Sequence, residues 1–104
     1  MESPVRELAR RLGENAEAVC RHYLSNGRRE GHYWMVGDKG NAPGRSLYLR
    51  LVDGDGRRTA GKWTDAATGE RGDLLDIIAA NCAHRNLAET LAEARRFLSL
   101  PPSD

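Results

Sequence analysis

The chain has 104 residues, 39% of them hydrophobic and 30% charged, with two cysteines and a formal net charge of +1. This composition predicts a single domain with a small core and a heavily charged surface. No apolar run approaches the ~18 residues that a membrane span needs, and the N-terminus lacks a signal-peptide pattern. We therefore expect a cytoplasmic protein with no membrane partner.

The charges are unevenly distributed along the chain. Residues 28–63 contain eight basic and four acidic residues, whereas residues 64–104 contain four basic and seven acidic ones. A basic segment attracts phosphate groups whatever the overall charge of the protein. The alternative is that these basic side chains only form solvent-exposed strand faces and turns and bind nothing.

Two helices are predicted before residue 27. Ser3 can cap the first helix, Pro4 suits its first position, and apolar residues follow at helical spacing. We expect Gly13 to end this helix and Asn15 to cap the second one. The Ser-Asn-Gly sequence at 25–27 tolerates a left-handed backbone and should end the second helix.

Three strands are predicted in the middle of the chain, over residues 32–36, 46–52 and 57–65. In the second strand three leucines share one face, while Tyr48 and Arg50 lie on the other, which is typical of a half-buried strand. The two Asp-Gly pairs at 53–56 favour a hairpin turn to the third strand. These leucines are Leu47, Leu49 and Leu51.

Two further helices are predicted after the strands. Asp73 can cap the first of them, and Asp76 is favoured in its first turn by the helix dipole. Asn86 can cap the last helix, which we expect Pro101 and Pro102 to end. The predicted order is ααβββαα, an α+β fold with a three-stranded antiparallel meander between helices. Residues 1–100 would form one domain, followed by a tail or linker at 101–104.

Residues 61–78 contain the most distinctive pattern of the chain. They read as a strand that ends near Trp63, a turn with glycines at 69 and 72, and a helix opened by Gly-Asp-Leu-Leu-Asp. Upstream lies Pro-Gly-Arg-Ser-Leu at 43–47, and downstream lies Leu-Ala-Glu-Thr-Leu at 87–91. This order resembles the zinc-ribbon domain at the N-terminus of bacterial, phage and plasmid DNA primases, which can precede a Toprim domain. The resemblance implies template binding and a primase or helicase partner.

The zinc ligands of that family are missing. The first metal knuckle falls on Met35 and Asp38, and the second falls on Asp65 and Thr68. Methionine and threonine are poor zinc ligands, and two carboxylates alone do not form a structural zinc site. The chain therefore resembles a metal-free relative, and we expect it to fold without zinc or any other cofactor.

The two cysteines, Cys20 and Cys82, are interpreted as small buried helix residues. A disulfide between them, or a metal pair with His22 or His84, are the alternatives. No nucleophile motif, phosphate-binding glycine loop or carboxylate pair with a nearby histidine is present. The chain is therefore not expected to be an enzyme, although it could be part of a primase-type enzyme.

A binding role has more support, because aromatic and basic residues alternate along the predicted strands. Sheets of this kind hold single-stranded nucleic acid by stacking bases on rings and pairing phosphates with cations. The alternative for Trp34 and Trp63 is that both fill a small core. The predicted nucleic-acid-binding residues are Trp34, Arg45, Tyr48, Arg50, Arg57, Arg58 and Lys62.

A tight turn at 53–56 sets the expected strand register. It places Arg50 opposite Arg58 or Thr59 and Lys62 near Ser46, unless a bulge shifts the pairing. Binding of single-stranded DNA in the replication of a phage, plasmid or other mobile element is the first hypothesis for function.

A second hypothesis is a phage or plasmid protein–protein interaction domain that docks to a primase, a helicase or a host defence complex. Its contact surface would include the acidic residues Asp73, Asp76, Glu89 and Glu93. A third is a folding domain of a longer enzyme with no activity of its own.

Overall fold

The computed structural model describes residues 3–54 and 59–100. Its helices are α1 (Pro4–Glu14), α2 (Ala16–Tyr23), α3 (Leu74–Cys82) and α4 (Leu87–Phe97). Its strands are β1 (Arg28–Glu30), β2 (Tyr33–Val36), β3 (Leu47–Arg50), β4 (Trp63–Asp65) and β5 (Arg71–Gly72). In the described part of the chain, no helix is long and apolar enough to cross a membrane.

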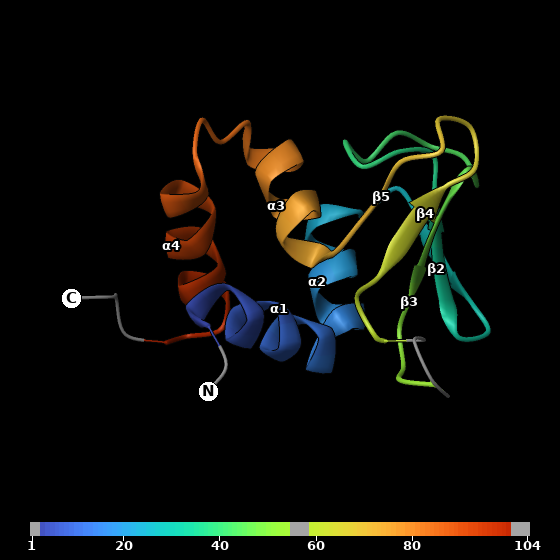
Figure 1. Ribbon diagram of the computed structural model, residues 1–104. Helices are drawn as coiled ribbons and strands as arrows, with labels where there is room; N and C mark the ends of the chain where they lie inside the picture. The colour runs from blue at the N-terminus through green and yellow to red at the C-terminus, as the bar shows by residue number, and fades with distance from the viewer. Residues whose placement is uncertain (1–2, 55–58, 101–104) are drawn as a thin grey trace.

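The strands form one antiparallel meander in the order β1-β2-β3-β4-β5. Figure 1 shows the four helices gathered on one side of this sheet, with α2 and α3 nearest to it. The predicted α+β class is confirmed, but the predicted three-stranded sheet is incomplete. Two edge strands, β1 and β5, extend it, and they are only three and two residues long, too short for an alternating pattern to reveal.

The core lies between the helices and the inner face of the sheet. The predicted inner face of β3 is confirmed, since Leu47 and Leu49 are fully buried and Leu51 is nearly so. Trp34 and Trp63 fill the same layer from the neighbouring strands, and their indole nitrogens donate to backbone carbonyls at 3.0 and 2.8 Å. Both tryptophans therefore act as core residues with satisfied polar groups.

The connection from β3 to β4 differs from the predicted tight hairpin. Leu49 pairs with Trp63, so Arg50 lies opposite Lys62, and Ala66 donates to Ser46. The predicted pairings of Arg50 with Arg58 or Thr59 and of Lys62 with Ser46 are therefore wrong. Residues 55–58, including two of the turn residues, lie outside the described part.

A β-bulge at Gly61 and Lys62 accompanies this register. The Gly61 amide donates to the Arg50 carbonyl and the Arg50 amide donates to the Lys62 carbonyl, so two residues oppose one. Gly61 has a φ of 95°, a conformation that glycine adopts without strain. The longer loop before this bulge moves β4 by about four residues from its predicted register.

Gly13 lies inside α1 and does not end it, contrary to the expectation. The helix continues to Glu14, and Gly13 is buried where the loop before β4 crosses the helix. A Cβ atom at Gly13 would lie 2.6 Å from the carbonyl oxygen of Ala60. A residue without a side chain is therefore needed at position 13, because the backbones of α1 and of the loop before β4 approach each other closely there.

Gly13→Ala is expected to destabilise the domain by about 1–3 kcal/mol, as overpacking does. Helix propensity alone predicts the opposite, a gain of about 1 kcal/mol. Gly40→Ala is the matched control, because its Cβ would approach only the Asp38 side chain, at 3.4 Å. Urea unfolding midpoints measure both changes, and a more stable Gly13→Ala protein would contradict this packing.

The helix ends confirm most of the predicted caps. The side chains of Ser3, Asp73 and Asn86 each accept a hydrogen bond from a first-turn amide. Asn15 makes no such bond; its side chain donates to the Arg11 carbonyl.

The described end of α4 is formed by the backbone around Ser99. Ser99 is left-handed, and the amides of Ser99 and Leu100 donate to the carbonyls of Arg96 and Arg95. This is a Schellman motif, which satisfies the last carbonyls of the helix. Pro101 and Pro102 lie outside the described residues.

The two cysteines have different environments. Cys20 is buried in the core, as predicted, and burial raises the pKa of its thiol to about 12. Cys82 is exposed at the end of α3, so its prediction as a buried residue is wrong. Both thiols are free, which leaves the disulfide alternative without support.

Candidate functional site

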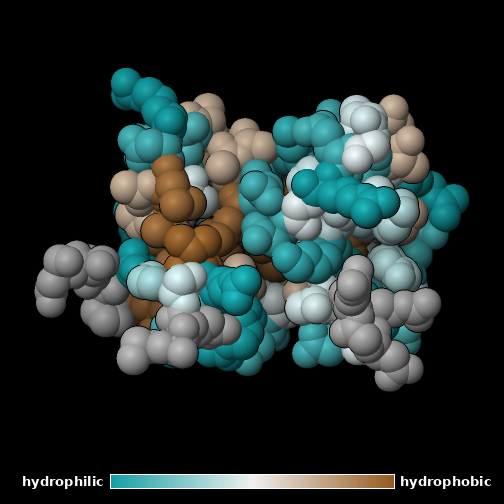
Figure 2. All heavy atoms as spheres, in the orientation of Figure 1, coloured by the Kyte–Doolittle hydropathy of each residue, from teal (hydrophilic) through white to brown (hydrophobic). Residues whose placement is uncertain are grey.

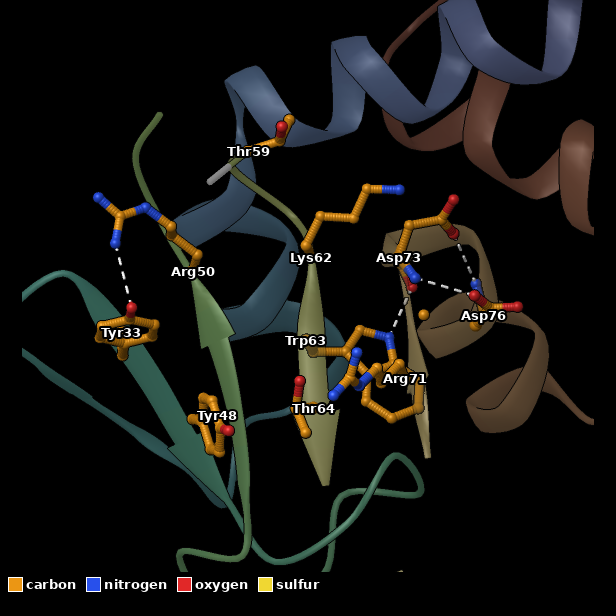
Figure 3. A pocket seen from close by; sticks show the side chains of 11 residues that line it. Tyr33, Tyr48, Arg50, Thr59, Lys62, Trp63, Thr64, Arg71, Asp73 and Asp76 are labelled. Atoms are coloured by element: carbon orange, nitrogen blue, oxygen red, sulfur yellow. Dashed lines mark hydrogen bonds between the residues drawn. The ribbon is translucent and has the colours of Figure 1, made fainter. Parts of the chain in front are cut away.

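The face of the sheet that points away from the helices is called the outer face. Its strand residues alternate with the buried ones and are half-buried or exposed. The residues that define it are Tyr33, Met35, Tyr48, Arg50, Lys62, Thr64 and Arg71. Figure 3 shows most of these side chains around one open hollow.

This hollow has a volume of about 430 Å³ and reaches from β2 across the sheet to the start of α3. Four strands and one helix therefore contribute to a single concave surface. Its lining residues are Tyr33, Tyr48, Arg50, Thr59, Lys62, Trp63, Thr64, Arg71, Gly72, Asp73 and Asp76.

The two tyrosines and Arg50 form a connected group on β2 and β3. The rings of Tyr33 and Tyr48 meet edge to face with centroids 6.0 Å apart. The Arg50 guanidinium lies 5.5 Å from the Tyr33 ring centroid, and its Nη1 donates to the Tyr33 hydroxyl at 3.1 Å. Its Nε also donates to the Val52 carbonyl at 2.7 Å. These contacts hold the Arg50 head beside the rings, while Tyr48 is 39% exposed.

Three cations line the hollow: Arg50, Lys62 and Arg71. In the part of the chain that the structure describes, none of the three forms an ion pair, whereas many other arginines do. Arg45, also a predicted binding residue, pairs with Glu30 at 2.6 Å. Arg50, Lys62 and Arg71 therefore keep charge for an incoming anion, although the Lys62 charge also acts on Asp73.

The other predicted binding residues divide into three groups. Tyr48, Arg50 and Lys62 come together around the hollow. Arg57 and Arg58 lie outside the described residues. Trp34 is only 3% exposed, with its indole nitrogen bonded to the Leu24 carbonyl, so its ring is not available to a base. The core alternative for Trp34 is therefore the correct one.

Arg71 is a lining residue that the sequence analysis missed. It pairs across from Thr64, which itself pairs with Tyr48, so all three lie on the same face. The two-residue strand β5 gives no periodic signal. The turn at 66–70 could have indicated this strand, because the chain runs back antiparallel to β4 after it. The Asp65 amide donates to the Glu70 carbonyl across this turn.

The end of the hollow at α3 is acidic. Asp73 and Asp76 form a capping box: the Asp73 carboxylate accepts from the amides of Leu75 and Asp76, and the Asp73 amide donates to the Asp76 carboxylate at 2.9 Å. Burial, and then the neighbouring Asp76 charge, raises the pKa of Asp73. The Lys62 side chain extends toward Asp73 (Figure 3), and its charge opposes this rise, so cations and carboxylates lie next to one another at this end of the hollow.

The knuckle positions of the primase resemblance are occupied by turns held by hydrogen bonds. The buried Asp65 carboxylate accepts from the Ala67 amide at 2.9 Å. Asp38 accepts from the amides of Gly40 and Ala42. Among residues 3–54 and 59–100, no group of three or more histidine, cysteine or acidic side chains is placed to hold a metal ion.

The two knuckle turns are joined by an ion pair between Lys39 and Glu70, with Nζ and Oε2 2.6 Å apart. We expect the domain to fold without zinc, because hydrogen bonds hold each turn and this ion pair joins the two turns. The unfolding midpoint should be unchanged by a chelator. Stoichiometric zinc in the purified protein, or unfolding on chelation, would contradict this expectation.

Scans against models of protein families, against curated proteins and against solved structures found no significant match to this chain.

Proposed function

We propose that this chain is a non-catalytic module that binds single-stranded DNA on the outer face of its sheet. The observation that carries the proposal is the hollow itself, in which exposed tyrosine and unpaired cations lie within one surface. Bases can stack on Tyr48 while Arg50, Lys62 and Arg71 contact phosphates. No helix covers this face, so an extended strand has access to it (Figure 1).

The relation to primase zinc-ribbon domains is part of the proposal. It is supported by the sequence motifs and by the strand–turn–helix order from β4 through β5 to α3. The module would serve replication of a phage, plasmid or other mobile element, with a primase Toprim domain or a helicase as partner. Its two knuckle turns would persist without metal.

Fluorescence anisotropy with a labelled oligo(dT) of about 12 nucleotides tests this function, since single-strand binders of this size cover about 4–16 nucleotides. Binding is expected at low salt and should weaken as salt rises, because phosphate contacts release counterions. No binding at ~50 µM protein in low salt would overturn the proposal, because phosphate-led binding is strongest there.

A second candidate function is docking to a protein partner through the helical side. Figure 2 shows apolar surface between α3 and α4, and Leu87 is 53% exposed. The acidic residues of these helices are less available than predicted. Glu93 accepts from Tyr23 and Arg96, and Glu89 accepts from the Arg85 amide. A partner that stays attached after nuclease treatment in a pull-down would favour this function.

A further inference from the structure

One row of outer-face residues crosses all five strands of the sheet. From β1 to β5, and paired step by step in the register, its members are Arg28, Met35, Tyr48, Thr64 and Arg71. Neighbouring strands lie about 4.8 Å apart, so the row is about 19 Å long. Its β5 half lines the hollow, where Figure 3 shows Tyr48, Thr64 and Arg71 side by side. The row then continues past the hollow to the β1 edge and has a cation at each end.

The β1 end of this row holds a group of three charged side chains. Glu30 lies across from Tyr33, so it shares the outer face with Arg28. Its Oε2 accepts from Arg28 Nε at 3.1 Å, and its Oε1 accepts from Arg45 Nη2 at 2.6 Å. Two guanidinium groups, one from β1 and one from the loop before β3, therefore converge on a single anion.

This anion occupies a position that suits a phosphate. Guanidinium groups bind carboxylates and phosphates through the same N–H donors. The Arg28 and Arg45 side chains are 72% and 63% exposed, and that of Glu30 is 31% exposed. Exposed ion pairs contribute little to stability, so an incoming phosphate can replace the carboxylate at small cost.

We propose that the bound strand crosses the sheet along this row and that one of its phosphates displaces Glu30 from Arg28 and Arg45. This inference rests on the proposed function and gives the path of the strand on that surface. One base stacks on Tyr48 at the middle of the row. The half-buried Met35 provides apolar surface between Tyr48 and the β1 edge. Glu30 is then an internal competitor that lowers the affinity for DNA.

Glu30→Gln tests this proposal by fluorescence anisotropy with labelled oligo(dT) of about 12 nucleotides. The variant should bind about fivefold more tightly at low salt, because the strand no longer has to break two exposed ion pairs. Adding Arg28→Ala and Arg45→Ala to this variant should remove the gain. It should also flatten the slope of log affinity against log salt by about 1.4, since two phosphate contacts are lost.

Glu17→Gln is the matched control. Glu17 also pairs with two arginines, Arg21 and Arg29, and its side chain is 32% exposed. Arg29 lies across from the buried Trp34, so this group of charges is on the helix side of the sheet. The control changes the net charge as Glu30→Gln does. Its affinity for oligo(dT) should nevertheless stay within about twofold of the unmodified protein, because distant exposed charges are screened.

The outcomes separate the two proposals. Failure of the unmodified protein and of all variants to bind overturns the proposed function. Unchanged or weaker binding by Glu30→Gln, an equal gain in Glu17→Gln, or a gain that persists without the two arginines overturns the path and leaves the proposed function standing. If Glu30→Gln does not fold, Arg28→Ala with Arg45→Ala in the otherwise unmodified chain decides, and an unchanged affinity and salt slope overturns the path.

Discussion

Trp63→Ala is expected to lower the free energy of unfolding by about 3–5 kcal/mol, the cost of truncating a buried aromatic residue. Trp63 is 4% exposed, and its Nε1 donates to the Asp73 carbonyl at 2.8 Å. The ring also packs against Gly72, where an added Cβ would lie 2.9 Å from it. The side chain thus fixes the start of α3 to β4 and, with it, the acidic end of the hollow.

Trp63→Phe is the matched control for this prediction. It keeps most of the ring volume and loses the hydrogen bond, so its cost should stay near 0.5–1.5 kcal/mol. Since small domains have about 5–15 kcal/mol of total stability, the loss in the alanine variant is a large fraction of the total. Urea unfolding measures both variants. An alanine variant with the midpoint of the unmodified protein would mean that Trp63 is not a core residue.

Removing the three cations of the hollow is expected to have the largest effect on DNA binding. The triple variant Arg50→Ala, Lys62→Ala, Arg71→Ala should weaken binding of oligo(dT). It should also flatten the slope of log affinity against log salt by about 2.1, since each single-strand phosphate contact contributes roughly 0.7. The Lys62→Ala and Arg71→Ala substitutions should change the stability of the domain little, because both side chains are exposed and make no ion pair in the described structure.

A charge-matched control is available on the other side of the molecule. Arg85, Arg95 and Arg96 belong to α4 and the segment before it, on the side away from the sheet (Figure 1). Their triple alanine variant changes the net charge by the same amount and should keep most of the slope. Equal losses of affinity and of salt slope in both variants would indicate only a net-charge effect. The binding site would then not lie on the outer face of the sheet.

The inner and outer faces of the central strands could be predicted from sequence, because period-two patterns report burial directly. Leu47 and Leu49 lie inside and Tyr48 lies outside, as expected. The caps at Ser3, Asp73 and Asn86 were equally predictable, since each depends on a local hydrogen bond.

Features that depend on distant contacts could not be predicted. Gly13 is typical of a helix end, but it lies within α1, at the point where the backbone of Ala60 crosses the helix. The bulge at Gly61 changed which residue faces Arg50, and a local pattern cannot specify the length of the loop before it. Arg71 joined the candidate site through a two-residue strand whose pairing is formed only in the folded sheet.

Amide chemical shifts of isotope-labelled protein, followed during titration with oligo(dT) at low salt, test the central claim most directly. The account predicts that the largest changes fall on the outer-face strands β2, β3, β4 and β5, at Tyr33, Tyr48, Arg50, Lys62, Thr64 and Arg71. Amides of α4 should hardly move. Changes concentrated on α4 and α1, with the outer-face amides unmoved, would contradict the account and favour the helical side as the binding surface.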